Sequence, residues 1–446
     1  MLLRLLLLIP IVFIPNTLRF DMPTGIPAIN LTNLMLIVIL AVMATERRDP
    51  YLPRSSGMLT APLIALFAVL GLGFAFTQVF SPANMGEDIL YVKNAVFYLL
   101  LYFVYRNCGQ DAEYVRKLIL LTMAVAALAG LEAIHQGLAY GIGNYSETNR
   151  ASGPFALDAS NANLAGVFFA MFLAMFVAVV LFLRGHWLWR LLAIGGSGIL
   201  ALGIMVTYSR QSYFIAVLCM GLLLMRRNLA LAILLGALAL PAIALLPASV
   251  TQRVQQTQQQ GIGGGVVYET SAASRVEIWK GAAQMWAEYP WGVGLNRFKH
   301  HIGDYTPAWK GYDAHNSYVL TLAELGPVGL AVLLWFLWRL WRLSRKVEAS
   351  VPRDDSLGLA LAMGFTMAVL AFAMGNLYGS RIFSGTMTAN FWILCALMER
   401  YAALTQATAK AGSTGMAVAG ADESTVLGGR FPLAARILPG RYLRRK

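Results

Sequence analysis

Charged residues are scarce in this 446-residue sequence. They make up 13% of it, whereas 58% of the residues are hydrophobic. A soluble domain has about a quarter charged and about 45–50% apolar residues. The composition therefore excludes a water-soluble enzyme, and it excludes a disordered chain as well. Cysteine is also rare, with three residues inside or at the ends of apolar stretches. We expect neither a disulfide in the outside loops nor a thiolate metal site.

Long apolar stretches are abundant. At roughly 20 residues per span, a chain of this length has room for about a dozen membrane spans. Each stretch must be helical, because lipid offers no hydrogen-bond partners to backbone amides and carbonyls. We predict twelve spans with these approximate bounds: Leu2–Ile14, Ala28–Thr45, Met58–Phe80, Ile89–Tyr105, Leu118–Gln136, Asn161–Leu183, Trp187–Tyr208, Ser212–Met225, Leu229–Pro247, Asn316–Leu343, Leu357–Tyr378 and Thr386–Leu404.

The distribution of basic residues orients these spans. If the N-terminus lies inside, every short inside loop carries Lys or Arg, as the positive-inside rule requires. The net charge of +13 therefore reports membrane orientation, and no nucleic-acid motif accompanies it. We expect a polytopic transmembrane domain over residues 1–404 with both termini inside. A flexible basic inside tail should follow over residues 405–446.

One outside loop is far longer than the others and covers residues 248–315. Long loops in compact proteins are usually functional or disordered. Residues 274–277 (SRVE) match a capping box, which predicts that a helix begins at Ser274. Apolar residues follow at helical spacing, and Pro290 and Gly292 end the pattern. We expect an amphipathic helix on or near the outer membrane face.

Three residues in this part of the chain are candidates for chemistry. At the predicted helix start, Arg275 would add a guanidinium to free backbone amides, an arrangement that binds phosphate. An ordinary ion pair with Glu277 is an equal alternative. Arg210 lies where the seventh span reaches the outer surface, and its alternative role is to contact lipid phosphates. His315 can take a proton from a hydroxyl, although a lone histidine at a span boundary is more often structural.

Two further features concern acids and metals. Glu324 lies inside the tenth span, where an acid is costly and functional by default. Nine residues place it on the helix face opposite His315, so we expect it to brace neighbouring helices. His300 and His301, with nearby acids, match no metal motif, and no outside loop carries a DxD motif. We therefore predict neither a metal nor a cofactor.

Several motifs together resemble the O-antigen ligase and polymerase superfamily. The similarity covers most of the chain between about residues 150 and 400. It rests on Ser209-Arg210, on Ser274-Arg275 followed by Ile278-Trp279, on Pro290-Trp291-Gly292-Val293-Gly294, on His315-Asn316 followed by Glu324-Leu325-Gly326, and on Arg150-Ala151-Ser152-Gly153-Pro154-Phe155 followed by Asn161-Ala162-Asn163-Leu164-Ala165.

The resemblance implies an all-α inner-membrane glycosyltransferase with one large, catalytic periplasmic loop. The donor would be a glycan on undecaprenyl pyrophosphate, and family members are understood to invert the anomeric centre without a metal. Arg210 and Arg275 would bind the pyrophosphate, while His315 would be the catalytic base. The candidate supporting residues are Asn316, Glu324, Arg150, Lys280 and Arg381.

The acceptor is left open by these motifs. It would be a sugar hydroxyl of the lipid A core in a ligase, which we favour, or another lipid-linked repeat unit in a polymerase. Protein O-glycosylation is a third possibility. A transporter or flippase would instead place charged or broken helices along a central path. Here the polar residues gather at the outer face.

Overall fold

The computed structural model describes residues 2–17, 30–45, 53–109, 111–141, 145–242, 258–260, 266–268, 270–380, 382 and 385–422. Helices dominate. The α-helices are α1 (Leu2–Leu6), α2 (Leu8–Phe13), α4 (Leu31–Thr45), α5 (Thr60–Phe80), α6 (Met85–Phe97), α7 (Leu100–Tyr105), α8 (Ala112–Tyr140), α9 (Ala162–Phe182), α10 (Trp187–Val206), α11 (Arg210–Arg227), α12 (Leu229–Ala242), α14 (Thr270–Glu288), α15 (Phe298–Tyr305), α16 (Ser317–Ser350), α17 (Ser356–Gly375) and α18 (Gly385–Asp422).

Short elements join these helices. An antiparallel pair of strands, β1 and β2, precedes α14 and aligns residue 258 with residue 268. The short elements are η1 (Ile14–Asn16), η2 (Gly153–Phe155), η3 (Ala159–Asn161), β1 (Gln258–Gln260), β2 (Val266–Tyr268), η5 (Pro307–Trp309) and η6 (Asn376–Tyr378).

Within the described residues, each predicted span overlaps one helix or a run of short helices. Seven helical segments in the described residues are long and apolar enough to cross a membrane. They begin at Thr60, Met85, Ala112, Ala159, Trp187, Ser317 and Ser356. Three further apolar helical segments, within residues 2–16, 31–45 and 229–238, are shorter. The helical class is confirmed, while the count of twelve spans stays a prediction.

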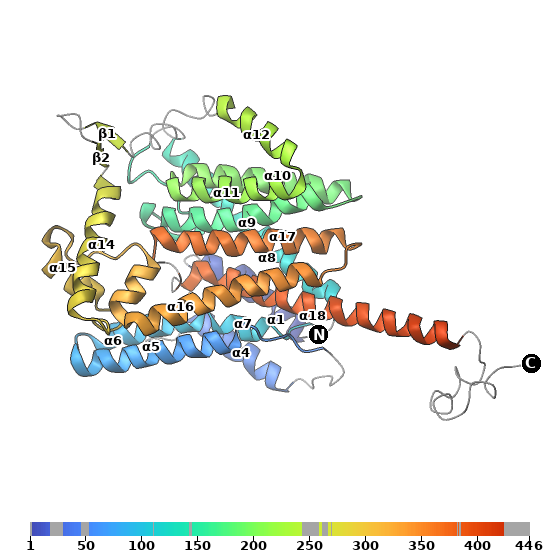
Figure 1. Ribbon diagram of the computed structural model, residues 1–446, viewed down its shortest axis with the longest axis horizontal. Helices are drawn as coiled ribbons and strands as arrows, with labels where there is room; N and C mark the ends of the chain where they lie inside the picture. The colour runs from blue at the N-terminus through green and yellow to red at the C-terminus, as the bar shows by residue number, and fades with distance from the viewer. Residues whose placement is uncertain are drawn as a thin grey trace, which may run out of the picture.

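The long helices lie side by side with their axes roughly aligned (Figure 1). α9 is central and packs against α17, α10 and α11. At one end of the bundle, α14 runs across the helix axes and α15 lies beside it (Figure 1). α18 extends from the opposite end and continues to Asp422, beyond the predicted end of the last span at Leu404 (Figure 1).

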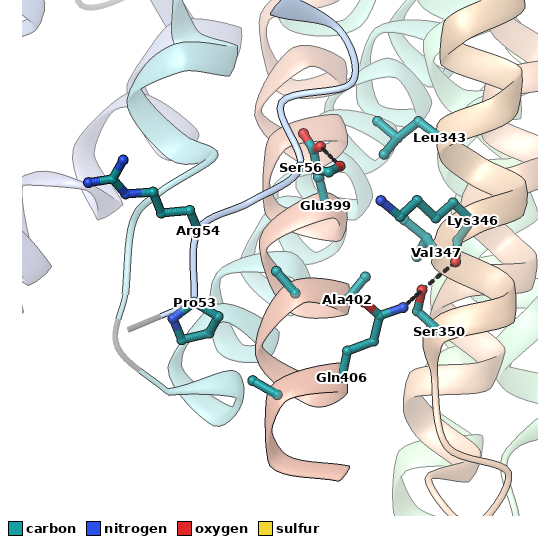
Figure 2. Close-up of a pocket in the computed structure, with 12 residues that line it drawn as sticks. Pro53, Arg54, Ser56, Leu343, Lys346, Val347, Ser350, Glu399, Ala402 and Gln406 are labelled. Atoms are coloured by element: carbon teal, nitrogen blue, oxygen red, sulfur yellow. Dashed lines mark hydrogen bonds between the residues drawn. The ribbon is translucent and has the colours of Figure 1, made fainter. Parts of the chain in front are cut away.

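α16 connects the two ends of the bundle. Its first turns lie under α14 and α15, and the helix is broken at Gly326, where φ is +65° and Pro327 follows. Proline lacks an N–H and cannot continue the hydrogen-bonding ladder, which explains the break. The last turns of α16 line a pocket against α18 at the far end of the bundle (Figure 2).

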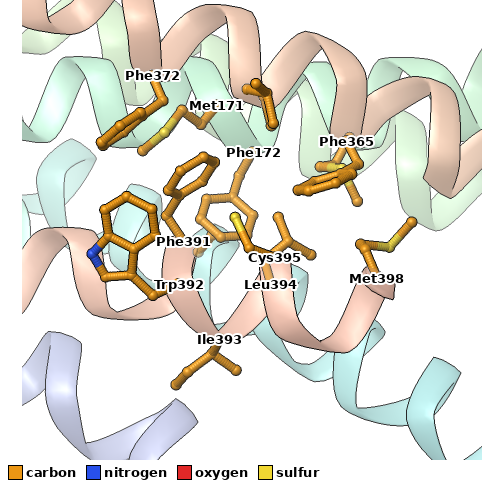
Figure 3. Packing of buried hydrophobic residues seen from close by; sticks show 14 of the residues in the cluster. Met171, Phe172, Phe365, Phe372, Phe391, Trp392, Ile393, Leu394, Cys395 and Met398 are labelled. Carbon is orange, nitrogen blue, oxygen red and sulfur yellow. The ribbon is translucent and has the colours of Figure 1, made fainter. Parts of the chain in front are cut away.

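The core near the middle of the bundle is aromatic. Phe391 of α18 stacks on Phe372 of α17 with ring centroids 4.4 Å apart, and Trp392 meets Phe372 edge-on (Figure 3). Phe172 of α9 lies in the same cluster (Figure 3). Since lipid tails are as apolar as these side chains, close van der Waals packing is what joins helices in a membrane. The cluster therefore fixes α9, α17 and α18 relative to one another.

Candidate active site

His315 lies just before the start of α16, in a backbone conformation that is uncommon for residues other than glycine. Its φ is +49°, in the left-handed region. Its backbone N–H donates to Asp313 Oδ2 at 3.1 Å, and its ring Nδ1 is 3.8 Å from the same oxygen. The side chain is 44% exposed. The imidazole thus lies near a carboxylate and is still reachable from outside the protein.

The two residues after His315 anchor the start of α16. The Asn316 side-chain oxygen accepts hydrogen bonds from the backbone N–H groups of Tyr318 and Val319, so this residue is the helix N-cap. Ser317 Oγ lies 2.6 Å from Asn376 Oδ1 and 3.1 Å from the Gly379 carbonyl oxygen. These contacts fix the start of α16 to the segment 373–379, which we call the α17 end.

α14 brings Arg275 to the same region. Trp279 Nε1 donates to the Ala314 carbonyl at 2.8 Å, directly before His315. The Trp279 ring also lies 6.0 Å from the ring of Tyr378 in the α17 end. Arg275 precedes Trp279 by four residues and therefore projects from the same face of α14. Arg275 is half-buried there.

The predicted start of α14 is wrong. The helix begins at Thr270, so Ser274 lies in its second turn and is not its N-cap. Alanine is the strongest helix former, and Ala272 and Ala273 extend the helix backwards. Glu277 does not reach back to a cap: its carboxylate accepts a hydrogen bond from Trp309 Nε1 at 2.6 Å. Arg275 consequently lacks the helix N-terminus that the sequence analysis assigned to it. The predicted end holds, since α14 stops at Glu288.

Arg210, unlike Arg275, lies at the N-terminus of a helix. It is the first residue of α11, and the Ser209 side chain does not cap the first-turn N–H groups. The neighbouring Gln211 donates to the carbonyls of Met374 at 3.0 Å and Gly375 at 2.9 Å. Arg210 is half-buried beside these contacts. The starts of α11 and α16, together with α14, therefore all contact the α17 end.

Arg150 supports the turn that precedes α11. It is 7% exposed, and its Nε donates to the Thr207 carbonyl at 3.0 Å. A second guanidinium nitrogen donates to the Asn163 side-chain oxygen. Ala151 N–H completes the attachment by donating to the Val206 carbonyl at 3.0 Å. Arg150 thus holds the segment leading to Arg210 against the start of α9.

Glu324 does not meet His315; it supports α15. Its carboxylate accepts a hydrogen bond from the backbone N–H of Phe298, the first residue of α15, at 3.1 Å. The glycine-containing loop after α14 docks on the backbone nearby: Val293 N–H donates to the Ala323 carbonyl and Gly294 N–H to the Glu324 carbonyl. Glu324 is therefore a brace between α16 and the long loop.

A buried ion pair that the sequence analysis missed fastens this loop to α6. Arg297 donates to both carboxylate oxygens of Asp88, at 2.8 and 2.6 Å. The two side chains are 2% and 3% exposed. Gln78 and Asn296 also donate to Asp88. Both charges and the surrounding polar atoms are thereby matched, which a buried pair requires.

A phenol joins the two helices of the loop. Tyr305 of α15 donates to Glu288 of α14 at 2.6 Å. Burial and the neighbouring Glu288 carboxylate raise the pKa of Tyr305 above its ordinary value. The phenol therefore stays protonated and keeps donating. With the Glu324 and Arg297 contacts, this makes α14 and α15 one braced unit.

Two predicted supporting residues remain. Lys280 is exposed on α14, and Arg381 lies outside the described residues. Within the part of the chain that the structure describes, no group of three or more His, Cys, Asp or Glu side chains is placed to hold a metal ion. The three cysteines are buried and free.

A comparison with known protein families identifies a match over part of this region. Residues 195–334 match the O-antigen ligase family. The matched range contains Arg210, Arg275, His315 and Glu324, whereas Arg150 precedes it. No curated protein matches the chain. The O-antigen ligase match confirms the resemblance seen in the motifs. With the apolar helices, it indicates a multi-pass membrane protein with glycosyltransferase-like ligase or polymerase chemistry.

Proposed function

We propose that this chain is an O-antigen ligase of the bacterial inner membrane. It transfers a glycan from undecaprenyl pyrophosphate to a sugar hydroxyl of the lipid A core, on the periplasmic face. The proposal is supported by contacts of the neighbouring residues: Gln211 and Ser317 bind the α17 end, and Trp279 lies against Tyr378 there and bonds to Ala314. The family match includes Arg210, Arg275 and His315.

The two arginines bind the donor pyrophosphate. As the bond from C1 to the pyrophosphate oxygen breaks, negative charge grows on the leaving group, and fixed cations stabilise that charge. Arg210 adds the uncapped first turn of α11 to its guanidinium, and helix N-termini favour phosphate groups. Arg275 supplies a second guanidinium from α14.

His315 acts on the acceptor. Its imidazole takes the proton of the acceptor hydroxyl while that oxygen attacks C1 from the side opposite the pyrophosphate, so the anomeric centre inverts. Asp313 lies beside Nδ1, which directs the proton to Nε2 and stabilises the imidazolium that forms. Charge neutralisation by the two guanidinium groups makes a metal ion unnecessary in this scheme.

A polymerase would use the same residues with a second lipid-linked repeat unit as the acceptor, and the O-antigen ligase match supports either activity. Reconstituted protein should therefore be given defined lipid-linked donor, with and without lipid A core, in vesicles without any ion gradient. A ligase gives glycan on lipid A core only when both are present. Chain extension with donor alone indicates a polymerase, and no product in either mixture refutes glycosyl transfer.

The metal-free chemistry is tested in the same vesicles. EDTA should leave the rate of glycan transfer unchanged, because the proposed reaction uses no metal ion and its positive charges come from arginine side chains. Loss of transfer in EDTA that added Mg²⁺ or Mn²⁺ restores would refute this part of the proposal.

A further inference from the structure

The pocket at the far end of α16 has the composition of a small polar binding site. It encloses about 330 Å³ between α16, α18 and the segment that precedes α5. This volume lies at the lower end of the range of ligand sites, roughly 300–1,000 Å³. Ser56, Ser350 and Gln406 give it polar walls, and Gln406 donates to Ser350 at 2.6 Å (Figure 2).

The charges at the pocket favour an anion. Lys346 is exposed and extends its ammonium group into the pocket (Figure 2). Arg54 also lines the pocket, but its guanidinium points away from Lys346 and Gln406 (Figure 2). Glu399 is the acid in the lining, but it is 3% exposed and its oxygens already accept hydrogen bonds from Ser56 Oγ, the Met58 N–H at 3.0 Å and the Tyr102 hydroxyl. Because these donors occupy the carboxylate, it does not serve as a ligand for a cation.

A row of side chains on α16 leads away from this pocket. Trp338, Arg342 and Lys346 follow one another at four-residue spacing and so share one face of the helix. The Arg342 guanidinium lies 5.3 Å from the centre of the Trp338 ring. Trp338 is 51% exposed. Indole rings prefer the interface of a membrane, and basic side chains next to them attract anionic headgroups.

We propose that this pocket and the row Trp338–Arg342–Lys346 form a binding site for a phosphate ester, with the phosphate at Lys346 and Arg342. An anionic phospholipid would place its headgroup in the pocket and its acyl chains along the apolar surface of α16. A soluble phosphate compound offers the same charge without the chains. Along α16 the site lies about 40 Å (Arg342) to about 46 Å (Lys346) from His315, from the rise of 1.5 Å per residue. It is therefore a separate site from that of the proposed glycosyl transfer.

The test is a titration of the detergent-purified full chain by calorimetry. The ligands are short-chain phosphatidylglycerol, short-chain phosphatidylcholine and inorganic phosphate. Phosphatidylglycerol should bind more tightly than phosphatidylcholine. Lys346→Gln should weaken phosphatidylglycerol about fivefold, since one basic residue near anionic lipid contributes about that factor. Lys346→Arg should restore binding, and Arg227→Gln, at an exposed basic residue outside the pocket, should leave it unchanged.

The outcomes separate the two sources of phosphate. Competition by inorganic phosphate indicates a soluble ligand, and its absence indicates that the lipid is the ligand. Equal binding of the two lipids to the wild-type chain, with no binding of phosphate, overturns the proposal. If Lys346→Gln and Arg227→Gln weaken phosphatidylglycerol binding equally, the proposal is also overturned, because the effect would then depend only on the net charge of the protein. Unchanged thermal midpoints establish that the variants are folded.

Discussion

The backbone at His315 carries strain that its neighbours maintain. A left-handed conformation at a non-glycine residue costs about 1–3 kcal/mol and persists only where the surrounding contacts enforce it. Here the Asp313 carboxylate, the Asn316 cap and the bond from Trp279 to Ala314 hold the turn from both sides. Such a conformation is typical of a side chain that must point in one direction, which is consistent with a role in proton transfer.

His315→Asn separates this conformation from the chemistry. Asparagine accepts a left-handed backbone better than most residues, so the variant should fold with an unchanged thermal midpoint. It has no base of suitable strength, and transfer of glycan from lipid-linked donor should fall about 10²–10⁴-fold. The matched control is His300→Asn, at an exposed position of α15, which should retain full activity. Near-normal turnover of the His315 variant would remove the base assignment.

Arg275→Lys tests whether a guanidinium is required or only a positive charge. A guanidinium offers two parallel N–H donors to a phosphate, whereas an ammonium is a point charge. We expect the rate of transfer to fall about 10²–10³-fold, the usual effect of removing one stabilising donor from a transition state. Arg184→Lys, at an exposed arginine just after α9, is the control for the exchange itself. Full activity of Arg275→Lys would make Arg275 a structural residue.

The sequence predicted the positions of the long helices better than it predicted where helices begin or which side chains pair between them. Apolar runs long enough to span a bilayer can only be helical, so hydropathy located every long helix of the bundle. The start of α14 was wrong because the alanines before Ser274 continue the helix. The pair Asp88–Arg297 was not predicted because 209 residues separate its members, and only the folded chain brings them together.

The break in α16 lies at Gly326, where the helix contacts the backbone of the loop that follows α14. At Gly326 the φ is +65°, and a Cβ would lie 2.6 Å from the Trp291 carbonyl oxygen. Gly326→Ala should therefore cost about 2 kcal/mol or more in stability and displace the loop from α16. Hydrogen exchange in α14 and α15 should rise. Gly221→Ala, at a helical glycine with no atom within 4 Å, should leave exchange unchanged. Normal exchange in the Gly326 variant would show that the break tolerates a side chain.

The ion pair between Asp88 and Arg297 should hold the loop in place. Removing one partner of a buried pair leaves an unmatched charge and costs about 3–5 kcal/mol. Asp88→Ala should therefore lower the thermal midpoint and loosen α15, as read by hydrogen exchange. Glu113→Ala provides the contrast, because Glu113 forms an exposed pair with Lys117 that is worth at most about 1 kcal/mol. Equal effects of the two substitutions would mean that the buried pair does not fasten the loop.

The whole molecule has two chemically different ends. The starts of α11 and α16 lie with α14 at one end and carry Arg210, Arg275 and His315. Basic side chains lie in the last turn of α11 and, between residues 339 and 346, toward the end of α16. The charge distribution predicted this polarity, because inside loops of a membrane protein are basic. Hydropathy and charge could not show that Gln211, Ser317 and Trp279, which are neighbours of the candidate residues, contact the α17 end, because those are tertiary contacts.

The direction in which the molecule crosses the membrane decides whether the proposed chemistry can occur, and its cysteines make that direction measurable. The three native cysteines are buried, at 3%, 1% and 0% exposure, so they should contribute little background labelling. Ala308→Cys lies on the loop beside α15, and Arg353→Cys lies between α16 and α17 at the opposite end; both positions are exposed. An impermeant maleimide should label Ala308→Cys in intact spheroplasts and Arg353→Cys only after permeabilisation. The reverse pattern would place His315 in the cytosol, away from a periplasmic acceptor, and the proposed ligase reaction could not take place there.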